Sequence, residues 1–332
     1  MSARVYSYPN EPDPAPSVLT IGAFDGVHRG HQHLLKLASE SAREKDARVI
    51  AITFEPLPVQ IFRPDAFPGR ILSNQRRREL LHHYGADVIV ELPFDRDLAK
   101  QTAAEFVEQM KVSGPILEIW VGDDFALGNG REGTPERLQE LLSDHGTTVH
   151  AVPRISWERR EVSSSAIRNH IMKGAAKEAS IILGHRFQVS GKVVQGAQLG
   201  RQIGFPTANV APPKGIVPLH DGIYASYATL NGETTLRPAM TYIGTRPAVN
   251  TGERMIETHL LDFAGDLYGM DLTTSFVTHL RPDSDFPSVE ELIEQLARDE
   301  GATRTILEQD QQVSLYESTN ATTVENPHGF RV

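Results

Sequence analysis

Two histidines, His28 and His31, flank Gly30 at the point where an apolar run is followed by a helical pattern. The run Val18–Ile21 predicts a buried strand, and apolar residues recur at helical spacing from Gln32 onward. A helix N-terminus carries unpaired N–H groups and the positive end of the helix dipole, so this arrangement suits a phosphate. Gly30 lets the backbone approach such a ligand closely. Zinc is the alternative ligand, but the spacing differs from that of zinc proteases and no third ligand is nearby.

A serine-rich segment offers a second helix start that suits phosphate. Ser163, Ser164 and Ser165 follow a predicted strand, and Arg168 lies in the first turns of the helix that they open. Serines at such a position are usually helix caps. Both motifs follow strands, however, so both fall at the carboxyl edge of a parallel sheet, where such folds bind ligands. The His-x-Gly-His spacing is the signature of nucleotidyltransferases, and together the two motifs predict a nucleoside triphosphate site.

The second half of the chain has a glycine-rich segment of its own. Gly196, Gly200 and Gly204 stand at four-residue spacing and can expose backbone N–H groups to phosphates, although this is not a Walker loop. Thr207 and Asn209 follow with neutral oxygens that can join Mg²⁺ bridging ATP phosphates. An ordinary glycine–proline hairpin loop is the alternative interpretation.

A glutamate later in this half is the candidate general base. Strand alternation within Met255–Phe263 puts Glu257, His259 and Leu261 on one face. A strand glutamate is usually only solvated. If Glu257 lines a ligand cleft, it can deprotonate a substrate hydroxyl, which is typically worth about 10²–10⁴ in rate.

Size and composition limit the classes of function. The chain has 332 residues, enough for two domains, and no cysteine, which excludes disulfides, thiolate metal sites and a cysteine nucleophile. A formal net charge of −10 argues against nucleic acid and anionic lipid as partners. No apolar run approaches a membrane span, so we expect a soluble cytoplasmic protein. Nothing in the sequence specifies an oligomeric state.

The first half alternates strand-like and helix-like patterns, which predicts a doubly wound parallel sheet with helices on both faces. The expected strands are Val18–Ile21, Val49–Phe54, Val88–Leu92, Ile116–Val121 and Thr147–Val152. The expected helices are His31–Lys45, Asn74–Tyr84, Thr102–Lys111 and Pro135–His145. Gly128–Gly133 fits the dinucleotide-binding pattern Gly-x-Gly-x-x-Gly, but it follows the fourth strand rather than the first. We therefore expect a flexible loop over the site there and no NAD.

After Gly184 the pattern changes to short alternating segments, which predict a small antiparallel β-barrel. A helix from Ser288 to Gln309 is expected to close it, with Ser288 and Glu291 as a capping box. From Gln311 the sequence is polar and without pattern, which indicates a disordered tail. The expected domains are therefore 1–183 and 184–310, followed by the tail 311–332. The expected barrel strands are Phe187–Val194, Ile223–Leu230, Ala239–Ile243, Met255–Phe263 and Leu272–Leu280.

From Val18 to Glu308 the chain resembles the bacterial bifunctional riboflavin kinase/FMN adenylyltransferase family, also called FAD synthetase. The most specific segment is Gly204–Asn209, Gly-Phe-Pro-Thr-Ala-Asn, which is typical of riboflavin kinases. The segments that carry the resemblance are Ile21–His31, Thr53–Pro56, Gly122–Phe125, Ser163–Arg168, Gly204–Asn209, Asp221–Tyr224, Ile243–Pro247, Glu257–Phe263 and Asp266–Gly269.

The resemblance implies two ATP-dependent reactions, riboflavin to FMN in the barrel domain and FMN to FAD in the first domain. In the barrel, Thr207 and Asn209 would serve Mg-ATP, and Glu257 would activate the ribityl 5′-hydroxyl. In the first domain, ATP would be bound at the two helix starts and attacked at its α-phosphorus by FMN. The implied ATP-binding residues there are Gly22, Phe24, His28, Gly30, His31, Ser163, Ser164, Ser165 and Arg168, and the implied flavin-binding residues are Asp124 and Phe125.

The chain departs from the family pattern at a few positions in the first domain. Leu57 stands where the family often has histidine, and Ala23 where it often has asparagine. Ala126 and Leu127 replace the usual arginine and phenylalanine in a loop expected near the flavin. These changes bear on FMN affinity and on the rate of adenylylation. Two alternatives follow: a riboflavin kinase without adenylylation, and a flavin- or nucleotide-binding protein without turnover.

Overall fold

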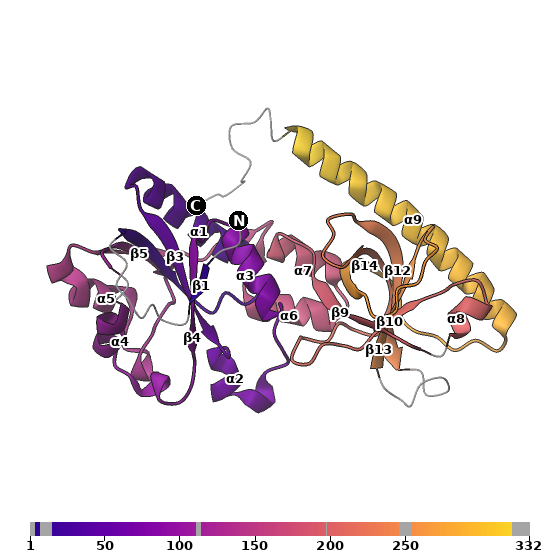
Figure 1. Ribbon diagram of the computed structural model, residues 1–332, viewed down its shortest axis with the longest axis horizontal. Coiled ribbons are helices and arrows are strands. Elements are labelled where there is room, and N and C mark those ends of the chain that lie inside the picture. Colours follow the sequence, from indigo (N-terminus) through magenta and orange to yellow (C-terminus); the bar gives the residue numbers. More distant parts are fainter. Residues whose placement is uncertain (1–3, 7–14, 111–113, 197, 246–253, 321–332) are drawn as a thin grey trace. The chain divides into compact units, whose positions relative to one another are not determined.

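The computed structural model describes residues 4–6, 15–110, 114–196, 198–245 and 254–320, with backbone alone for 4–6 and 311–320. The chain divides into two compact units, residues 1–164 and 165–332 (Figure 1). Our predicted boundary lies after residue 183, where helix α7 (Ala176–Leu183) ends, whereas the structure divides after residue 164. That helix belongs to the second unit because it packs against strand β14 (Asp271–Arg281).

The first unit contains the predicted parallel sheet. Its six strands lie in the order β1-β4-β3-β2-β5-β6, and every pairing between them is parallel. Strand β1 was not predicted, nor was the small antiparallel hairpin of β7 (Ser156–Trp157) and β8 (Arg160–Glu161). The strands are β1 (Arg4–Tyr6), β2 (Ser17–Ile21), β3 (Arg48–Glu55), β4 (Val88–Pro93), β5 (Ile116–Gly122) and β6 (Thr148–Val152).

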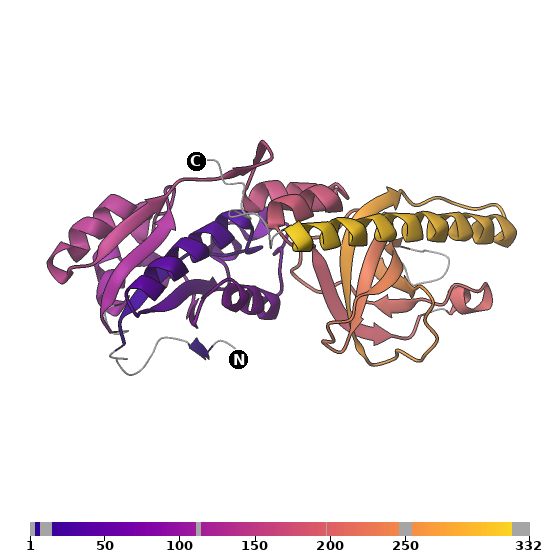
Figure 2. The ribbon, with the colours of Figure 1, turned by 90° about the horizontal axis from the view of Figure 1, so that it is seen from above.

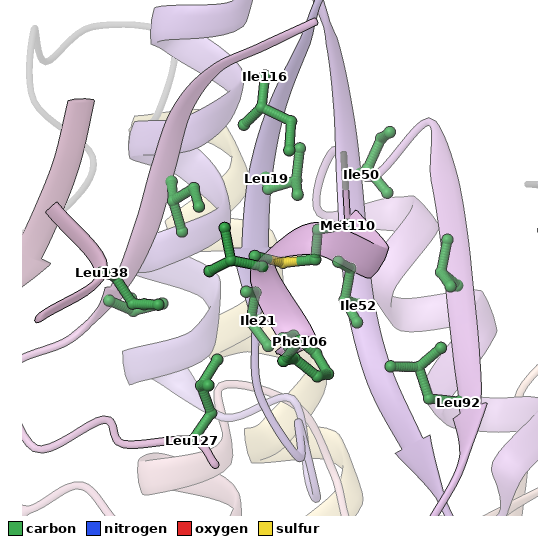
Figure 3. Close-up of a cluster of buried hydrophobic side chains, with 14 of the residues drawn as sticks. Leu19, Ile21, Ile50, Ile52, Leu92, Phe106, Met110, Ile116, Leu127 and Leu138 are labelled. Carbon is green, nitrogen blue, oxygen red and sulfur yellow. The ribbon is translucent and has the colours of Figure 1, made fainter. Parts of the chain in front are cut away.

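Helices cover both faces of this sheet. Alternation along β2 sends Val18 to the face that carries α1, where it packs with Ala38 and Ala42. Leu19 and Ile21 point to the other face and pack with Phe106 and Met110 of α4, as Figure 3 shows. Lys111, the expected end of α4, lies outside the described residues. The helices are α1 (Arg29–Glu44), α2 (Pro58–Phe62), α3 (Asn74–His83), α4 (Ala103–Met110) and α5 (Pro135–Leu142).

The strand order fixes where a ligand can bind. From β2 the chain builds outward through β3 and β4 on one side, then returns to place β5 and β6 on the other. The order reverses at β2, so the crevice opens at the carboxyl ends of β2 and β5. The turn with His28 follows β2, and the segment with Phe125 follows β5. Both predicted binding segments therefore lie at the topological switch point.

A buried arginine ties this edge of the sheet together. Arg77 of α3 is fully buried, and its Nη2 donates to Glu91 of β4 at 3.1 Å and to Glu55 of β3 at 3.0 Å. Its Nη1 donates to the carbonyl oxygens of Ala23 and Phe54, at 3.2 and 3.1 Å. A single guanidinium thus joins the ends of two strands to the turn that follows a third.

The second unit is the predicted antiparallel barrel. Six strands close in the order β10-β13-β12-β11-β14-β9. A chain of buried hydroxyls, Ser226, Thr241, Thr258 and Thr274, crosses its interior through hydrogen bonds of 2.7 to 3.2 Å. Strand β10 was not predicted, because it has only three residues. The strands are β9 (Gln188–Val194), β10 (Ala208–Val210), β11 (Gly222–Leu230), β12 (Arg237–Thr245), β13 (Arg254–Leu260) and β14 (Asp271–Arg281).

A long helix, α9 (Val289–Asn320), lies along the barrel (Figure 2). It packs on the outward residues Ala225 and Tyr227 through Leu307, and Asp299 pairs with Arg281 of β14 at 2.8 Å. The expected start of a tail at Gln311 is corrected, since α9 continues to Asn320; residues 321–332 lie outside the described residues. Among the described residues, no helix has the length and apolar character needed to cross a membrane.

The arginine network generates a stability prediction. Arg77→Met removes the hydrogen bonds to Glu91, Glu55 and two carbonyl oxygens, although Arg78 still pairs with Glu91 and Arg70 with Glu55. We therefore expect the first unit to lose about 1.5–3 kcal/mol of unfolding free energy. Arg76→Met is the matched control, because Arg76 is on the same helix and only bridges exposed Glu79 at 2.9 Å. Urea unfolding followed by tryptophan fluorescence measures the effect, since Trp120 and Trp157, the two tryptophans, both lie in the first unit. Equal effects of the two variants would contradict the assignment.

Candidate active sites in the two units

The turn after β2 is held in an unusual backbone conformation. Phe24, Gly26 and Val27 have positive φ angles of 49°, 91° and 38°. Such strain persists only where the surroundings fix it. Here the Ala23 carbonyl accepts from Arg77 and from Thr53 Oγ1, the latter at 3.2 Å. This fixed turn places the start of α1 at the switch point.

Asp25 in the same turn is held from two sides. Its carboxylate accepts from the Ile71 backbone N–H at 3.0 Å, and its carbonyl accepts from Ser164 Oγ at 2.8 Å. The hydroxyl contact brings the serine motif against the histidine turn, as the sequence predicted. Ser165 and Arg168 lie farther along α6 (Ser164–Met172), in the second unit, and their part in the ATP site stays a prediction.

The two histidine rings stack at the start of α1. Their centroids are 3.7 Å apart and their planes differ by 17°. Burial, and then repulsion by His28, hold the pKa of His31 well below its usual 6.5, so the pair does not carry two positive charges at neutral pH. Within the described part of the chain, His31 Nδ1 has no hydrogen-bond partner. The contact of this buried nitrogen with ATP stays a prediction.

Two predicted residues of this turn act through packing. The Phe24 side chain is fully buried, and its ring meets His31 edge-on at 5.1 Å. The contact of Phe24 with ATP stays a prediction. A Cβ atom on Gly30 would lie 3.2 Å from the His28 ring, so this glycine makes room for the histidine. Gly22 donates its N–H to the Ile52 carbonyl at 3.0 Å and so continues the pairing of β2 with β3.

The first unit also contains a cavity of about 530 Å³ with an apolar and aromatic lining. That volume falls in the usual range for small-molecule sites. Phe125 lines this cavity together with Phe54, Phe62 and Phe94. Asp124 is not among the lining residues, and its carboxylate pairs with Arg154. Of the two predicted flavin-binding residues, the structure therefore brings only Phe125 to the cavity.

Two of the four departures from the family pattern are located at the same cavity. Ala126 and Leu127 line it, whereas Leu57 is buried with 1% of its surface exposed. The loop Gly128–Gly133 lines the cavity through its residues up to Arg131, and its flexibility stays a prediction. Its base is held between Leu127 and Gly133. Those two residues exchange backbone hydrogen bonds of 3.2 and 2.9 Å, and Glu132 accepts from Ala103 N at 2.8 Å at the start of α4.

In the barrel, strand pairing brings the predicted kinase residues together. Asn209 of β10 stands directly opposite Glu257 of β13, so both side chains share one face. Thr207 Oγ1 lies 3.5 Å from Glu257 Oε2. The Glu257 side chain is buried, with 8% of the residue exposed. The interpretation of Glu257 as merely a solvated strand residue is therefore wrong.

Two cavities meet at Thr207. One, of about 80 Å³, is lined by Thr207, Asn209 and Arg201, and the other, of about 50 Å³, by Thr207 and Glu257. Hydroxyl, amide and carboxylate oxygens therefore gather where the cavities adjoin, and these are donors that Mg²⁺ accepts. Within the described ranges, no cluster of three His, Cys, Asp or Glu residues could hold a metal alone. A metal here would need further oxygen ligands, such as water or a phosphate.

The glycines of the kinase motif have steric roles that the sequence did not reveal. A Cβ on Gly196 would lie 2.6 Å from Asn209 Nδ2, and one on Gly200 would lie 2.3 Å from the Phe205 carbonyl oxygen. Gly204 has a φ of +90°, which favours glycine. These residues let the chain pass close to Asn209 and Phe205. Their contact with phosphate stays a prediction.

Sequence reasoning missed two cations at these sites. Arg201 lines the cavity with Asn209, and it is the one cation inside the glycine-rich motif, which is a signal that could have identified it. Arg77 stands in the run Arg76–Arg78, a pattern that is typical of a solvated helix surface. Its spacing to Leu80 and Leu81, the other buried residues of α3, places it on the apolar face of the helix.

Comparison with known proteins agrees with this geometry. The family described as FAD synthetase matches residues 10–166, and the one described as riboflavin kinase matches residues 183–307. A bifunctional riboflavin kinase/FMN adenylyltransferase of Escherichia coli K12 is 38% identical over 86% of this chain and 91% of its own length. The corresponding protein of Pseudomonas fluorescens is 38% identical over 87% and 92%.

The chain belongs to the bifunctional riboflavin kinase/FMN adenylyltransferase family. A solved structure named as a macrolide-efflux protein from Streptococcus pneumoniae is also similar, with a TM-score of 0.83 and 30% identity over 92% of this chain and 99% of that one. Membership in a bifunctional family agrees with the two separate candidate nucleotide sites in this chain. The FAD synthetase match contains the histidine turn, and the riboflavin kinase match contains Thr207, Asn209 and Glu257.

The low pKa of His31 predicts a pH dependence of stability in this family member. The unfolded chain gains a proton below pH 6.5 that the folded His31 does not, so the stability present above that pH is lost as the pH falls. His31→Asn should remove this loss, which amounts to at most about 1.4 kcal/mol per pH unit. Urea unfolding between about pH 7 and 5, followed by tryptophan fluorescence, tests it. His145→Asn, at an exposed position, is the control; an unchanged slope in His31→Asn would refute the prediction.

Proposed function

We propose that this protein converts riboflavin to FMN in its barrel and FMN to FAD in its first unit, using ATP each time. The observation that carries the proposal is the position of Thr207 between two cavities, with Asn209 on one side and Glu257 on the other. Phosphoryl transfer needs such an arrangement, because acceptor and donor must approach in line from opposite sides.

In the kinase reaction, Glu257 takes the proton of the ribityl 5′-hydroxyl. The hydroxyl oxygen then attacks the γ-phosphorus of ATP, the bond to the bridging oxygen breaks, and ADP leaves. The cavity beside Glu257 has apolar walls from Phe205, Met240 and Leu296, which suit a flavin ring. The cavity beside Asn209 has Arg201, which suits the phosphates of ATP.

Thr207 and Asn209 are the proposed protein ligands of Mg²⁺. Mg²⁺ commonly keeps waters and substrate phosphates as ligands, so two neutral oxygens from the chain are sufficient. When bound with ATP, the ion neutralises charge that develops on the phosphates. The two side chains fix the position of the γ-phosphate between the nucleotide cavity and the acceptor cavity.

In the adenylyl transfer, a phosphate oxygen of FMN attacks the α-phosphorus of ATP and pyrophosphate leaves. The N–H groups at the start of α1, with His28 and His31, stabilise the negative charge of the triphosphate. The large cavity with Phe125 holds the flavin ring. No covalent bond to the protein is required, so the turn contributes position and electrostatics.

A cytoplasmic location and small-molecule partners complete the proposal. The formal net charge of −10 disfavours binding to nucleic acid or to anionic membranes.

The departures at Ala126 and Leu127, which line the flavin cavity, favour a second candidate: a riboflavin kinase without adenylylation. Incubation with riboflavin, ATP and Mg²⁺, followed by chromatography of the flavins, separates the possibilities. FAD supports the proposal, FMN alone supports the second candidate, and unchanged riboflavin refutes both.

The base assignment yields a variant prediction. Glu257→Gln keeps the shape of the side chain but removes the proton acceptor, so FMN formation should fall by about 10²–10⁴. Conversion of supplied FMN to FAD should be unchanged, because that reaction occurs in the other unit. Glu233→Gln, at an exposed position of the barrel unit, is the control. Kinase turnover at the rate of the control would show that Glu257 is not the base.

The histidine turn yields the reciprocal prediction. His28→Asn combined with His31→Asn removes two groups that face the triphosphate, and FAD formation should fall by at least about 10². Riboflavin phosphorylation in the same preparation serves as the internal control and should not change. Undiminished FAD formation in the double variant would show that the rings only pack against each other.

A further inference from the structure

A three-residue segment, Phe205–Thr207, forms the wall between the two cavities of the barrel. Pro206 and Thr207 line the cavity with Asn209, whereas Phe205 and Thr207 line the one with Glu257. Under the proposed kinase function, nucleotide and flavin approach this wall from opposite sides. A small shift of the wall therefore changes the distance and angle between the reacting oxygen and the γ-phosphorus.

Each residue of the wall is held by a different contact. Phe205 donates its N–H to the Gly200 carbonyl at 2.8 Å, and Thr207 Oγ1 lies 3.5 Å from Glu257. Pro206 has no N–H, so its carbonyl is its single backbone polar group. That carbonyl is 2.7 Å from Nδ1 of His259. The hydrogen bond from His259 is thus the polar contact that fixes the centre of the wall.

His259 is itself held in the orientation that this bond requires. It lies on β13 two residues after Glu257, so both side chains share one face of the strand. Its ring meets Phe205 edge-on, with centroids 5.5 Å apart. Because a carbonyl oxygen only accepts, Nδ1 must carry the proton. The contact therefore needs a donor at that position and does not depend on a charge.

We infer that His259 is a positioning residue for phosphoryl transfer: it holds the wall at Pro206, aligns the two substrates and keeps water from the γ-phosphorus. The inference rests on the proposed kinase function. With the wall displaced, a water oxygen can attack the γ-phosphorus in place of the ribityl hydroxyl. That reaction consumes ATP and water and gives ADP, inorganic phosphate and a proton, without forming FMN.

Two variants separate the hydrogen bond from the ring. His259→Phe keeps an aromatic ring against Phe205 but has no donor, whereas His259→Asn keeps a donor near the Nδ1 position and loses the ring. The full chain is incubated with riboflavin, ATP and Mg²⁺, and ADP is measured against FMN plus FAD. ADP comes only from transfer or hydrolysis at the γ-phosphorus, since adenylyl transfer releases pyrophosphate.

We expect wild type and His259→Asn to form about one ADP per flavin phosphorylated, as the stoichiometry of the kinase reaction requires. In His259→Phe, kcat for FMN formation should fall about tenfold, because one hydrogen bond is lost, and the ratio of ADP to FMN plus FAD should rise above one.

Impaired folding would lower ADP and FMN together and leave this ratio at one, so a ratio of one in His259→Phe overturns the inference. Equal defects in both variants would also overturn it, because they would assign the effect to the ring. If wild type forms no FMN, the proposed function fails and the inference fails with it; if wild type forms FMN and His259→Phe behaves identically, the inference alone fails.

Discussion

The first unit depends on one buried guanidinium. Arg77 has no exposed surface, and it binds Glu91, Glu55 and the carbonyls of Ala23 and Phe54 at the same time. Removing a charge from water is unfavourable unless it is paired and hydrogen-bonded, and here the carboxylates and carbonyls provide that compensation. The consequence is geometric, since the arginine can be buried only where the ends of β3 and β4 and the turn after β2 converge. The strained turn that presents the histidines is therefore fixed by an interaction that itself touches no substrate.

In both units, hydrogen bonds from side chains to backbone carbonyls hold a turn of the candidate site in position. In the first, side-chain donors hold the carbonyls of Ala23 and Asp25; in the second, a histidine holds the carbonyl of Pro206. Binding a turn through its backbone carbonyls fixes its path whichever side chains it carries. It also explains why the donors lie on regular elements such as α3 and β13, since these are more rigid than the turns that they hold.

Much of this could be predicted from the sequence because period and spacing are local properties. The five predicted strands of the first half and the five of the second all occur, and the pairing of Asn209 with Glu257 agrees with the motif. Strands β1 and β10 were missed because three residues are too few to show a period. The role of Arg77 was missed because a run of arginines resembles a solvated surface, and only tertiary contacts show that one member points inward. The tight approaches at Gly30 and Gly196 were missed for the same reason: they depend on a neighbouring side chain, not on the glycine itself.

The two proposed flavin-binding cavities differ greatly in volume. The first unit has a preformed cavity of about 530 Å³, whereas the space beside Glu257 is about 50 Å³, below the usual volume of a ligand site. A flavin ring can therefore enter the barrel only if the walls from Leu199 to Ile203 or at Leu292 move apart. Substrate binding energy is then used to open and refill this space, which is the condition for induced fit. The space of about 50 Å³ is large enough to admit water, so entry of the flavin ring must also displace water from beside Glu257.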